Sequence, residues 1–243
     1  MPPFLSLTRP TIADARECVK YGQQRGFNYP RELAGRSDDD DASGGGSSSS
    51  AIIADVASSS SHKYSRRRWV EDRTRAEIGS GERTYARACA ALKTWEHFDL
   101  GWASVDANTG HSVGDGVCVR ARVGGVWMRN PLEIVRLRGA EGGARRRGVK
   151  KRFSFAHGTM EGHVLAGEER FAVELMDDGR VYYEAYAFSA PAHAVALIGY
   201  PLVRLLQKRF HWDSARVMRK RLPLQPTWSA CWALPITQQQ GRT

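Results

Sequence analysis

Alternation of apolar and polar residues is clearest in residues 168–189, where two alternating runs flank a short polar loop at 177–179. A three-residue hairpin loop with Gly179 at positive φ places the apolar residues of the two runs opposite one another. A two-residue loop would set Val173 against Glu184 and mix the two faces, so the alternation favours the longer loop. The apolar pairs then expected are Leu175 with Val181, Val173 with Tyr183, and Phe171 with Ala185. The other face of this hairpin carries Arg170, Glu174, Tyr182, Glu184 and Tyr186.

Helical spacing of apolar residues marks two segments in the first half of the chain. Residues Thr11–Gln24 begin at a threonine that can act as N-cap, with Asp14 three residues later, and Gly26 closes the helix. A second helix is predicted to follow Gly79-Ser80-Gly81 and to continue through Phe98. Its apolar face is expected to carry Tyr85, Cys89, Leu92 and Trp95.

A third and longer helix is predicted near the end of the chain. Ser189 and Pro191 resemble the start of a helix, and we place its end near Leu222. Pro201 either kinks this helix or marks where its regular part begins, because proline cannot donate a backbone hydrogen bond. Its apolar stripe consists of Ile198, Leu202, Leu205, Leu206, Phe210 and Val217.

Short runs typical of β-strands account for much of the remaining chain. They are Phe4–Pro10, Trp69–Ile78, Gly101–Val105, Val117–Val123, Val126–Met128, Leu132–Leu137 and Arg152–Ala156. The predicted order is strand, helix, several antiparallel strands and a long terminal helix. A curved antiparallel β-sheet with the long C-terminal helix packed across it satisfies this order, because each buries the apolar side of the other. The predicted fold class is therefore α+β, in the helix-grip or START-like arrangement.

Composition divides the chain into four parts. Residues 1–32 are expected to form an N-terminal strand and helix, and residues 66–222 the main α+β domain. Between them, residues 33–65 contain runs of Asp, Gly and Ser with too few apolar side chains to offset the entropy of ordering, which predicts a disordered insertion. The Pro-containing residues 223–243 are predicted to be a disordered tail.

Positive charge is concentrated in two clusters, although the whole chain has a formal net charge of +10. Residues 136–152 hold eight Lys or Arg against Glu141, and residues 204–221 hold seven against Asp213. A solvated loop and a solvated helix end explain both, and the alternative is a surface that binds phosphate or an anionic membrane. The residues assigned to such a surface are Arg145, Arg146, Arg147, Lys150, Lys151 and Arg152. No nucleic-acid-binding motif accompanies them in the sequence, so nucleic acid is not the expected partner.

Cysteine spacing and hydropathy indicate in which cellular compartment the protein is expected. The four cysteines are isolated from one another, which argues against a disulfide framework or a zinc knuckle and fits a reducing compartment. The sequence has no apolar stretch of the ~18 residues that a membrane span needs, and its first twenty residues lack an apolar signal core. We expect a cytoplasmic monomer without cofactor or metal, with association with the outer surface of an organelle as a further candidate.

One resemblance to a known family is specific. Phe155–His163 reads Phe-Ala-His-Gly-Thr-Met-Glu-Gly-His and is followed by Gly-Glu-Glu-Arg-Phe at residues 167–171. This stretch resembles the signature of domain-of-unknown-function family 1990, also called uncharacterised protein family 0548, and it is most similar to the plant members. The resemblance covers nearly all of Trp69–Leu222, although His157 replaces the aromatic residue usual at its position. It implies a fold but no established activity and no inherited site.

The polar groups with most chemical potential are His163, Glu168 and Glu169. An imidazole near carboxylates could serve as an oriented base or as part of a metal site. Glu168 and Glu169 point to opposite faces of a strand, however, so at most one of them can share a site with a given neighbour. The structural alternative is that His163 caps a glycine-shaped connection and one glutamate pairs with an arginine.

Aromatic residues with polar tips on a curved sheet could line a cavity for an amphipathic ligand, with ordinary core packing as the alternative. The residues assigned to such a cavity are Trp95, Trp102, Trp127, Tyr182, Tyr183 and Tyr186. We therefore expect a module that binds a hydrophobic or lipid-like small molecule between the sheet and the C-terminal helix. Two other hypotheses stay open: an enzyme of unknown reaction that uses His163 with Glu168 or Glu169, and association of the basic clusters with an anionic membrane or nucleic acid.

Overall fold

The computed structural model describes residues 4–41, 67, 69–139, 147–192 and 199–221. The strands in these ranges are β1 (Leu5–Ser6), β2 (Val70–Ser80), β3 (Ala103–Ser104), β4 (Gly116–Val123), β5 (Val126–Arg138), β6 (Val149–Thr159), β7 (Leu165–Met176) and β8 (Arg180–Pro191). The helices are α1 (Ile12–Arg25), α4 (Gly81–Lys93) and α6 (Tyr200–Arg221), with short 3₁₀ turns η1 (Arg31–Leu33), η2 (Arg36–Asp41) and η3 (Glu96–Phe98).

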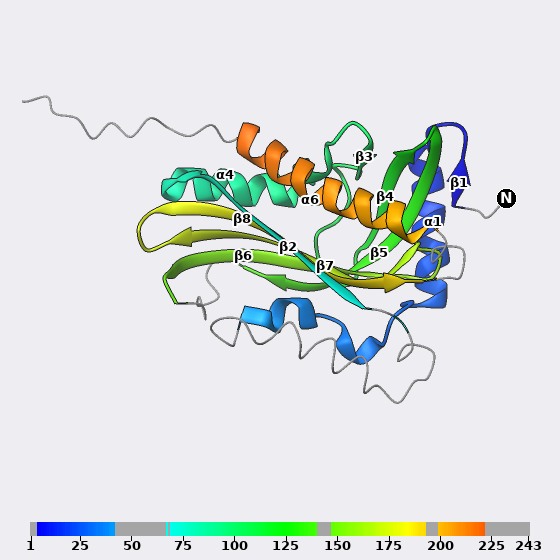
Figure 1. Cartoon of the computed structure of the whole chain (residues 1–243), viewed down its shortest axis with the longest axis horizontal. Coiled ribbons are helices and arrows are strands. Elements are labelled where there is room, and N and C mark those ends of the chain that lie inside the picture. Colours follow the sequence, from blue (N-terminus) through cyan, green and yellow to red (C-terminus); the bar gives the residue numbers. More distant parts are fainter. Residues whose placement is uncertain (1–3, 42–66, 68, 140–146, 193–198, 222–243) are drawn as a thin grey trace, which may run out of the picture.

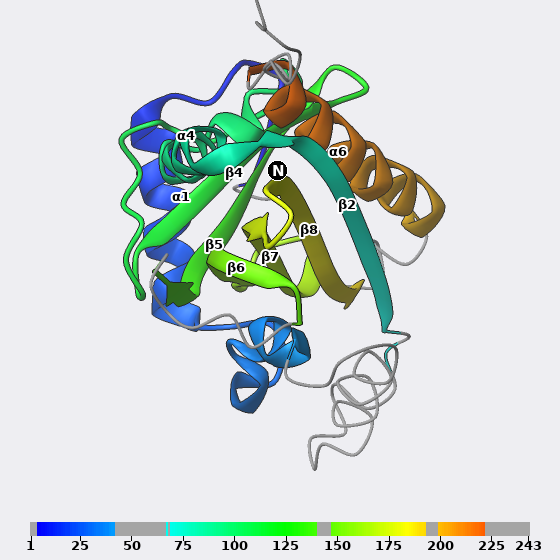
Figure 2. The same ribbon diagram turned by 90° about the vertical axis from the view of Figure 1, so that its left-hand side faces the viewer.

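In this described part of the chain, one antiparallel sheet runs in the order β2-β8-β7-β6-β5-β4-β3, and β1 pairs with β5. The sheet is curved, and α4 and α6 lie along one side of it while η1 and η2 lie on the other (Figure 1). Figure 2 shows α6 beside β2 at one edge, with α1 at the opposite side next to β4 and β5. A curved antiparallel sheet with a long C-terminal helix across it is the helix-grip arrangement, which confirms the predicted fold class.

The β7–β8 hairpin has the predicted register. Leu175 pairs with Val181, and the alternation continues along the ladder to Phe171 and Ala185. Gly179 has a φ of 84°, which a residue without Cβ adopts at little cost. The apolar side of the hairpin faces α4 and α6, so alternation in the sequence correctly identified the face that builds the core.

Helix α1 has the predicted N-terminal cap. The Thr11 side chain accepts a hydrogen bond from the Asp14 amide at 3.2 Å, and the Asp14 carboxylate accepts one from the Thr11 amide at 2.7 Å. This reciprocal pair satisfies amides that the first turn of a helix leaves without partners. The helix ends at Gly26, as expected.

Two predicted helix boundaries differ from the structure. The helix expected to reach Phe98 ends at Lys93, and Trp95, at a φ of 60°, turns the chain into η3. Ser189 and Pro191 belong to β8 rather than to the last helix, because the β7–β8 ladder extends as far as Leu165 opposite Pro191. Helix α6 begins at Tyr200, so Pro201 lies in the first turn, where its missing N–H costs no intrahelical bond.

Residues 33–41, which we predicted as part of a disordered insertion, lie against the sheet. Here Gly35 and Ser37 donate backbone hydrogen bonds to Glu168, and the Asp38 side chain is fully buried. Composition did not reveal this, because these polar residues pair with charged side chains on the strands instead of forming an apolar core. The rest of the predicted insertion, residues 42–65, and the predicted tail, residues 223–243, lie outside the described ranges.

The main core fills the space between the concave face of the sheet and the helices α4 and α6. Aromatic rings dominate its centre, where Phe171 lies 5.4 Å from Phe155 and 5.6 Å from Phe98, measured between ring centroids. Phe210 of α6 extends this stack, with its ring 4.7 Å from Phe98. The terminal helix is thus held by aromatic packing along its central turns, and this packing fixes the distance between α6 and the sheet.

Candidate functional site

A cavity of about 180 Å³ lies between the concave face of the sheet and the N-terminal half of α6. Its walls are mostly apolar and include Phe98, Trp102, Leu132, Ala187, Leu206 and Phe210. An apolar protein cavity of about 150 Å³ is large enough to hold benzene. The space therefore fits an apolar group of roughly that size.

Glu169 of β7 supplies a charged group to this apolar space. Its carboxylate lies 3.2 Å from Nε2 of His157 on β6 and 2.9 Å from Nε2 of His211 on α6. His157 is the direct register partner of Glu169 across the β6–β7 ladder, whereas His211 reaches it from the helix above. Because an ionised carboxylate can only accept, both imidazole Nε2 atoms donate to it.

The two histidines keep Glu169 ionised. Burial alone would raise the pKa of this carboxyl, but the hydrogen bonds from His157 and His211 outweigh it and lower the pKa to about 2. The Glu169 side chain retains 19% of its exposure and contributes to the wall of the cavity, whereas both imidazoles are almost fully buried. Each carboxylate oxygen has a further lone pair beyond the one used by a histidine, so Glu169 can accept a hydrogen bond from a ligand.

Aromatic packing holds His157 in place. Its ring lies 5.5 Å from Phe171 and 6.1 Å from Phe98 between centroids, both in edge-to-face geometry. Trp95 stacks nearly parallel to it at 6.5 Å. The imidazole is therefore oriented by packing on several sides, and the hydrogen bond to Glu169 has a defined geometry.

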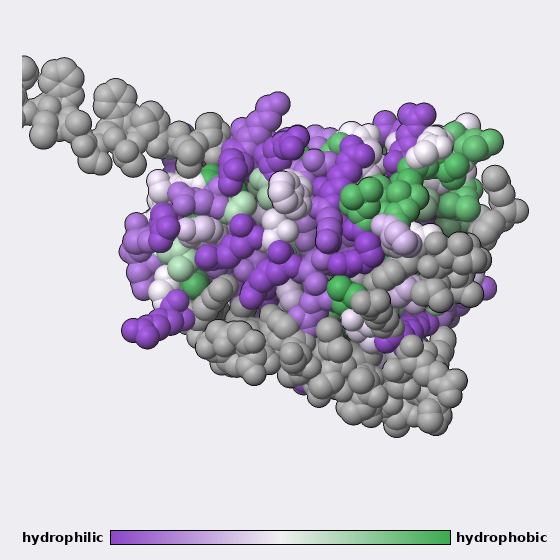
Figure 3. Space-filling view, viewed as in Figure 1, coloured by the Kyte–Doolittle hydropathy of each residue, from purple (hydrophilic) through white to green (hydrophobic). Residues whose placement is uncertain are grey.

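The cavity has a rim at the N-terminal half of α6. Val203 on the helix and Val123 and Met128 on the β4–β5 hairpin line the cavity and are partly exposed. Figure 3 shows an apolar patch on the surface over this end of α6 and the neighbouring strands. Beside the rim, the indole of Trp102, the residue before β3, donates to the Asp213 carboxylate of α6 at 3.0 Å.

The structure does not join the predicted catalytic residues into one group. His163 lines the cavity, but its Nδ1 atom is engaged with the backbone of Leu165 at 2.9 Å, and burial lowers its pKa to about 4. The Glu168 carboxylate is held on the convex side of the sheet by Tyr29 Oη at 2.8 Å and the Gly35 amide at 2.6 Å. Of the three, only Glu169 has histidine partners, and these are His157 and His211, which the sequence analysis did not assign to a site.

The predicted aromatic lining is corrected in most positions, since of those six residues only Trp102 lines the cavity. Tyr182 and Tyr186 lie on the opposite face of β8, where Arg75 and Arg170 stack over their rings. Three others serve structural contacts: Trp95 donates to the Thr109 carbonyl at 3.1 Å, Tyr183 hydrogen-bonds Ser214 at 2.5 Å, and Trp127 packs under Arg9 beside β1. Alternation along β8 accounts for the error, because neighbouring tyrosines cannot face the same side.

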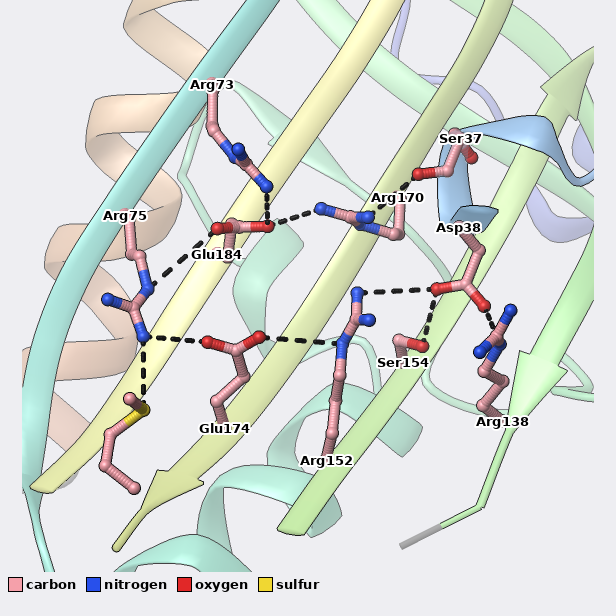
Figure 4. Close-up of polar contacts among 11 residues, drawn as sticks. Ser37, Asp38, Arg73, Arg75, Arg138, Arg152, Ser154, Arg170, Glu174 and Glu184 are labelled. Atoms are coloured by element: carbon pink, nitrogen blue, oxygen red, sulfur yellow. Dashed lines mark hydrogen bonds and ion pairs between the residues drawn. The ribbon is translucent and has the colours of Figure 1, made fainter. Parts of the chain in front are cut away.

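The convex face of the sheet carries a buried lattice of ion pairs (Figure 4). Glu174 lies between Arg75 at 2.8 Å and Arg152 at 3.7 Å, and Arg152 continues the chain to Asp38 at 3.4 Å. A second branch joins Arg73, Glu184 and Arg170, and Arg170 donates to the Ser37 carbonyl at 2.8 Å. The turn η2 covers the lattice around Asp38 and Arg170, whereas Arg73 and Arg75 keep 40% and 28% of their side-chain exposure at β2.

The basic cluster assigned to an anionic surface is divided by the structure. Arg152 is buried in the convex lattice, so it is not available to an external surface. Lys150 is exposed, Lys151 is partly exposed, and both pair with Glu82, at 3.1 and 2.9 Å. Arg147 is exposed, and Arg145 and Arg146 lie outside the described residues.

Two kinds of feature are missing from the described ranges. No cluster of His, Cys, Asp and Glu side chains there is arranged to hold a metal ion. No helix there combines the length and the apolar character needed to cross a bilayer.

Sequence comparison places these observations in a family. The model of a domain of unknown function, DUF1990, matches residues 54–217. A UPF0548 protein of Arabidopsis thaliana is 38% identical over 148 residues, which cover 61% of this chain and 71% of that protein. A UPF0548 protein of Dictyostelium discoideum is 36% identical over 157 residues, again with 61% and 71% covered. These matches confirm the family indicated by the motifs around Phe155–His163.

Solved structures show more distant likenesses. A hypothetical protein of Helicobacter pylori superposes with a TM-score of 0.45 at 12% identity, covering 65% of this chain and 90% of that one. Ginseng major latex-like protein 151 from Panax ginseng gives a TM-score of 0.38 at 13% identity, with 64% and 98% covered. The function is therefore argued from the cavity itself.

Proposed function

The chain belongs to the DUF1990 family, and we propose that it binds a hydrophobic small molecule that carries one hydrogen-bond donor. The observation behind this proposal is an ionised carboxylate, that of Glu169, in the wall of a largely apolar cavity. The apolar part of the ligand would contact the walls, and its donor would meet the carboxylate. A hydroxyl or an amine has this chemistry.

The charge on Glu169 supports the choice of ligand. A buried charge is costly unless it is hydrogen-bonded, and the hydrogen bonds from His157 and His211 meet that requirement. A ligand donor then adds a hydrogen bond to a charged acceptor, which is stronger than one between neutral groups. An anionic head group at the same place would lie beside a like charge in a water-poor space, so the site disfavours it.

A matched pair of ligands tests this proposal directly. 1-Octanol and octanoate share an apolar chain and differ in the head group. We expect octanol to raise the melting temperature and to appear in native mass spectra, with octanoate binding at least about tenfold more weakly. Glu169→Gln should narrow this difference, because the neutral amide no longer repels the carboxylate. Equal affinity of the native protein for both compounds would contradict the proposed chemistry.

The position of the ligand needs a variant that fills the cavity. Val203→Trp adds volume from α6, where the side chain is only partly buried, so the helix can accommodate the change. Its control is Ala86→Trp, at an exposed position of α4. If octanol binds in this cavity, Val203→Trp should lose octanol binding and Ala86→Trp should keep it. Unchanged binding in both variants would mean that octanol binds elsewhere.

A further inference from the structure

The outer face of α6 combines exposed apolar side chains with a row of cations. Leu202, Leu205 and Trp212 keep 52%, 63% and 71% of their exposure. Exposed cations recur on the same face at helical spacing: Lys208, Arg209, Arg216 and Lys220. The single acidic residue of the helix, Asp213, is engaged by Trp102 at 3.0 Å and by Arg209 at 3.3 Å. Several large apolar residues on one exposed face, set among cations, are typical of an interaction surface.

This face lies beside the rim of the cavity. Leu202 and Leu205 alternate along the helix with Val203 and Leu206, which line the cavity. Figure 3 shows the apolar end of α6 as one patch next to a mainly hydrophilic surface. A hydrophobic ligand that leaves the cavity past Val203 would therefore emerge next to the exposed leucines.

We infer that the outer face of α6 docks on an anionic phospholipid surface, so that the rim of the cavity opens toward the bilayer from which the ligand is taken. This inference rests on the proposed function. A helix with apolar and cationic residues on its outer face can lie in the membrane interface, with the leucines and tryptophan among the acyl chains and the cations near lipid phosphates. A second copy of this chain is the weaker occupant, because pairing two such faces would bring like cations together.

Vesicle co-sedimentation tests the charge requirement. The native protein should bind vesicles of 30% phosphatidylserine in phosphatidylcholine, bind pure phosphatidylcholine much more weakly, and dissociate as salt is raised. Arg216→Glu with Lys220→Glu should reduce binding by at least about 25-fold, since each cation near such a surface contributes about fivefold. The control, Arg16→Glu with Lys20→Glu, reverses the same charge at the same spacing on the exposed side of α1 and should have little effect.

A second pair of variants tests the apolar contact. Leu205→Ser removes a side chain that is 63% exposed, and Val113→Ser removes one that is 62% exposed in a loop. Only the first should weaken vesicle binding, by about fivefold or more, and circular dichroism should show both variants folded. Equal losses in the α6 and control variants would show general charge or apolar attraction and overturn the inference. A dimer that Leu205→Ser dissociates would assign the face to a second copy and overturn it as well.

These results are separable from those on the ligand. Octanol binding is measured without vesicles, and vesicle binding is measured without octanol. If octanol binds in the cavity but the vesicles sediment alone, the docking inference fails and the proposed function stands. If the vesicles bind but octanol does not, the docking surface stands and the ligand proposal fails, together with the idea that docking serves its uptake.

Discussion

Adjacent glutamates on β7 experience opposite environments. Glu168 points to the convex side, where burial dominates and raises the pKa to about 7 despite hydrogen bonds from Tyr29 and the backbone of Gly35. Glu169 points to the cavity, where two imidazoles overcome the effect of burial and lower the pKa to about 2. One residue along a strand thus separates a carboxyl that burial drives toward its neutral form from one that is held charged.

Glu169 should stabilise the fold only where it is ionised. Its pKa in the folded protein is below the value of 4.5 in the unfolded chain, so its contribution is complete above pH 4.5 and is lost as the pH falls toward 2. Relative to Glu169→Gln, the native protein should lose on the order of 3 kcal/mol of unfolding free energy across this window. Urea unfolding at several pH values measures the difference, and a constant difference would contradict the assignment.

Glu168 should have the opposite dependence on pH. Its folded pKa is above the unfolded value, so the folded state binds a proton that the unfolded chain releases between pH 4.5 and 7. The stability of the native protein should therefore fall relative to Glu168→Gln as the pH rises through this window, by about 3 kcal/mol. A difference that grows with pH would mean that the donors around Glu168 outweigh burial.

The residues around Glu169 show what the sequence could and could not predict. Alternation correctly separated Glu168 from Glu169, because it depends only on the geometry of a strand. The partners His157 and His211 could not be found in this way, since one depends on the register between β6 and β7 and the other on the placement of α6. Gly162 in the β6–β7 turn has a φ of 101°, as Gly179 has a φ of 84° in the next turn, but the sequence analysis used only Gly179 to set a register.

Among the elements, η2 differs most from what its amino-acid composition predicts. Residues 36–41 are polar and contain four consecutive aspartates, a composition typical of disorder. In the fold, the Asp38 carboxylate lies among the arginines of β5 and β6, and Ser154 donates to it at 2.9 Å. The stability of this turn depends on charges brought together by the sheet, which local composition cannot predict. The strands β7 and β8 were predicted correctly because apolar and polar residues alternate within their own sequences.

Removing the Asp38 carboxylate tests whether the turn and the sheet depend on each other. Asp38→Ala takes a fully buried acceptor away from Arg138 and Arg152, which are themselves mostly buried. We expect a loss of about 3 kcal/mol or more in unfolding free energy, because a buried cation is left without this partner. Asp178→Ala, which breaks a half-exposed pair with Arg180, should cost much less. Equal and small losses in chemical denaturation would show that η2 is only loosely coupled to the sheet.

At the scale of the whole molecule, the two faces of the sheet differ in the kind of side chain that they carry. On the convex face, ion pairs join neighbouring strands to one another and to η2. The concave face is packed with aromatic rings under α4 and the C-terminal half of α6, and the cavity lies under the N-terminal half of α6. Phe210 packs against Phe98 and His211 against Glu169, whereas the first turns of α6 are held to β2 and β8 by polar side chains, through the Arg204–Asp72 ion pair and the Gln207–Ser189 hydrogen bond.

This asymmetry predicts where a ligand changes the dynamics. Octanol in the cavity should slow amide hydrogen exchange in residues 200–210 of α6 and in the β4–β5 hairpin, because these elements form the rim and gain contacts when the space is filled. Residues 31–41 on the convex face touch neither the rim nor the ligand, so their exchange should not change. Mass spectrometry of exchange with and without octanol, in the native protein and in Val203→Trp, measures both regions. Slowing that includes residues 31–41 to the same degree would mean that the ligand stabilises the whole fold and not the rim of the cavity in particular.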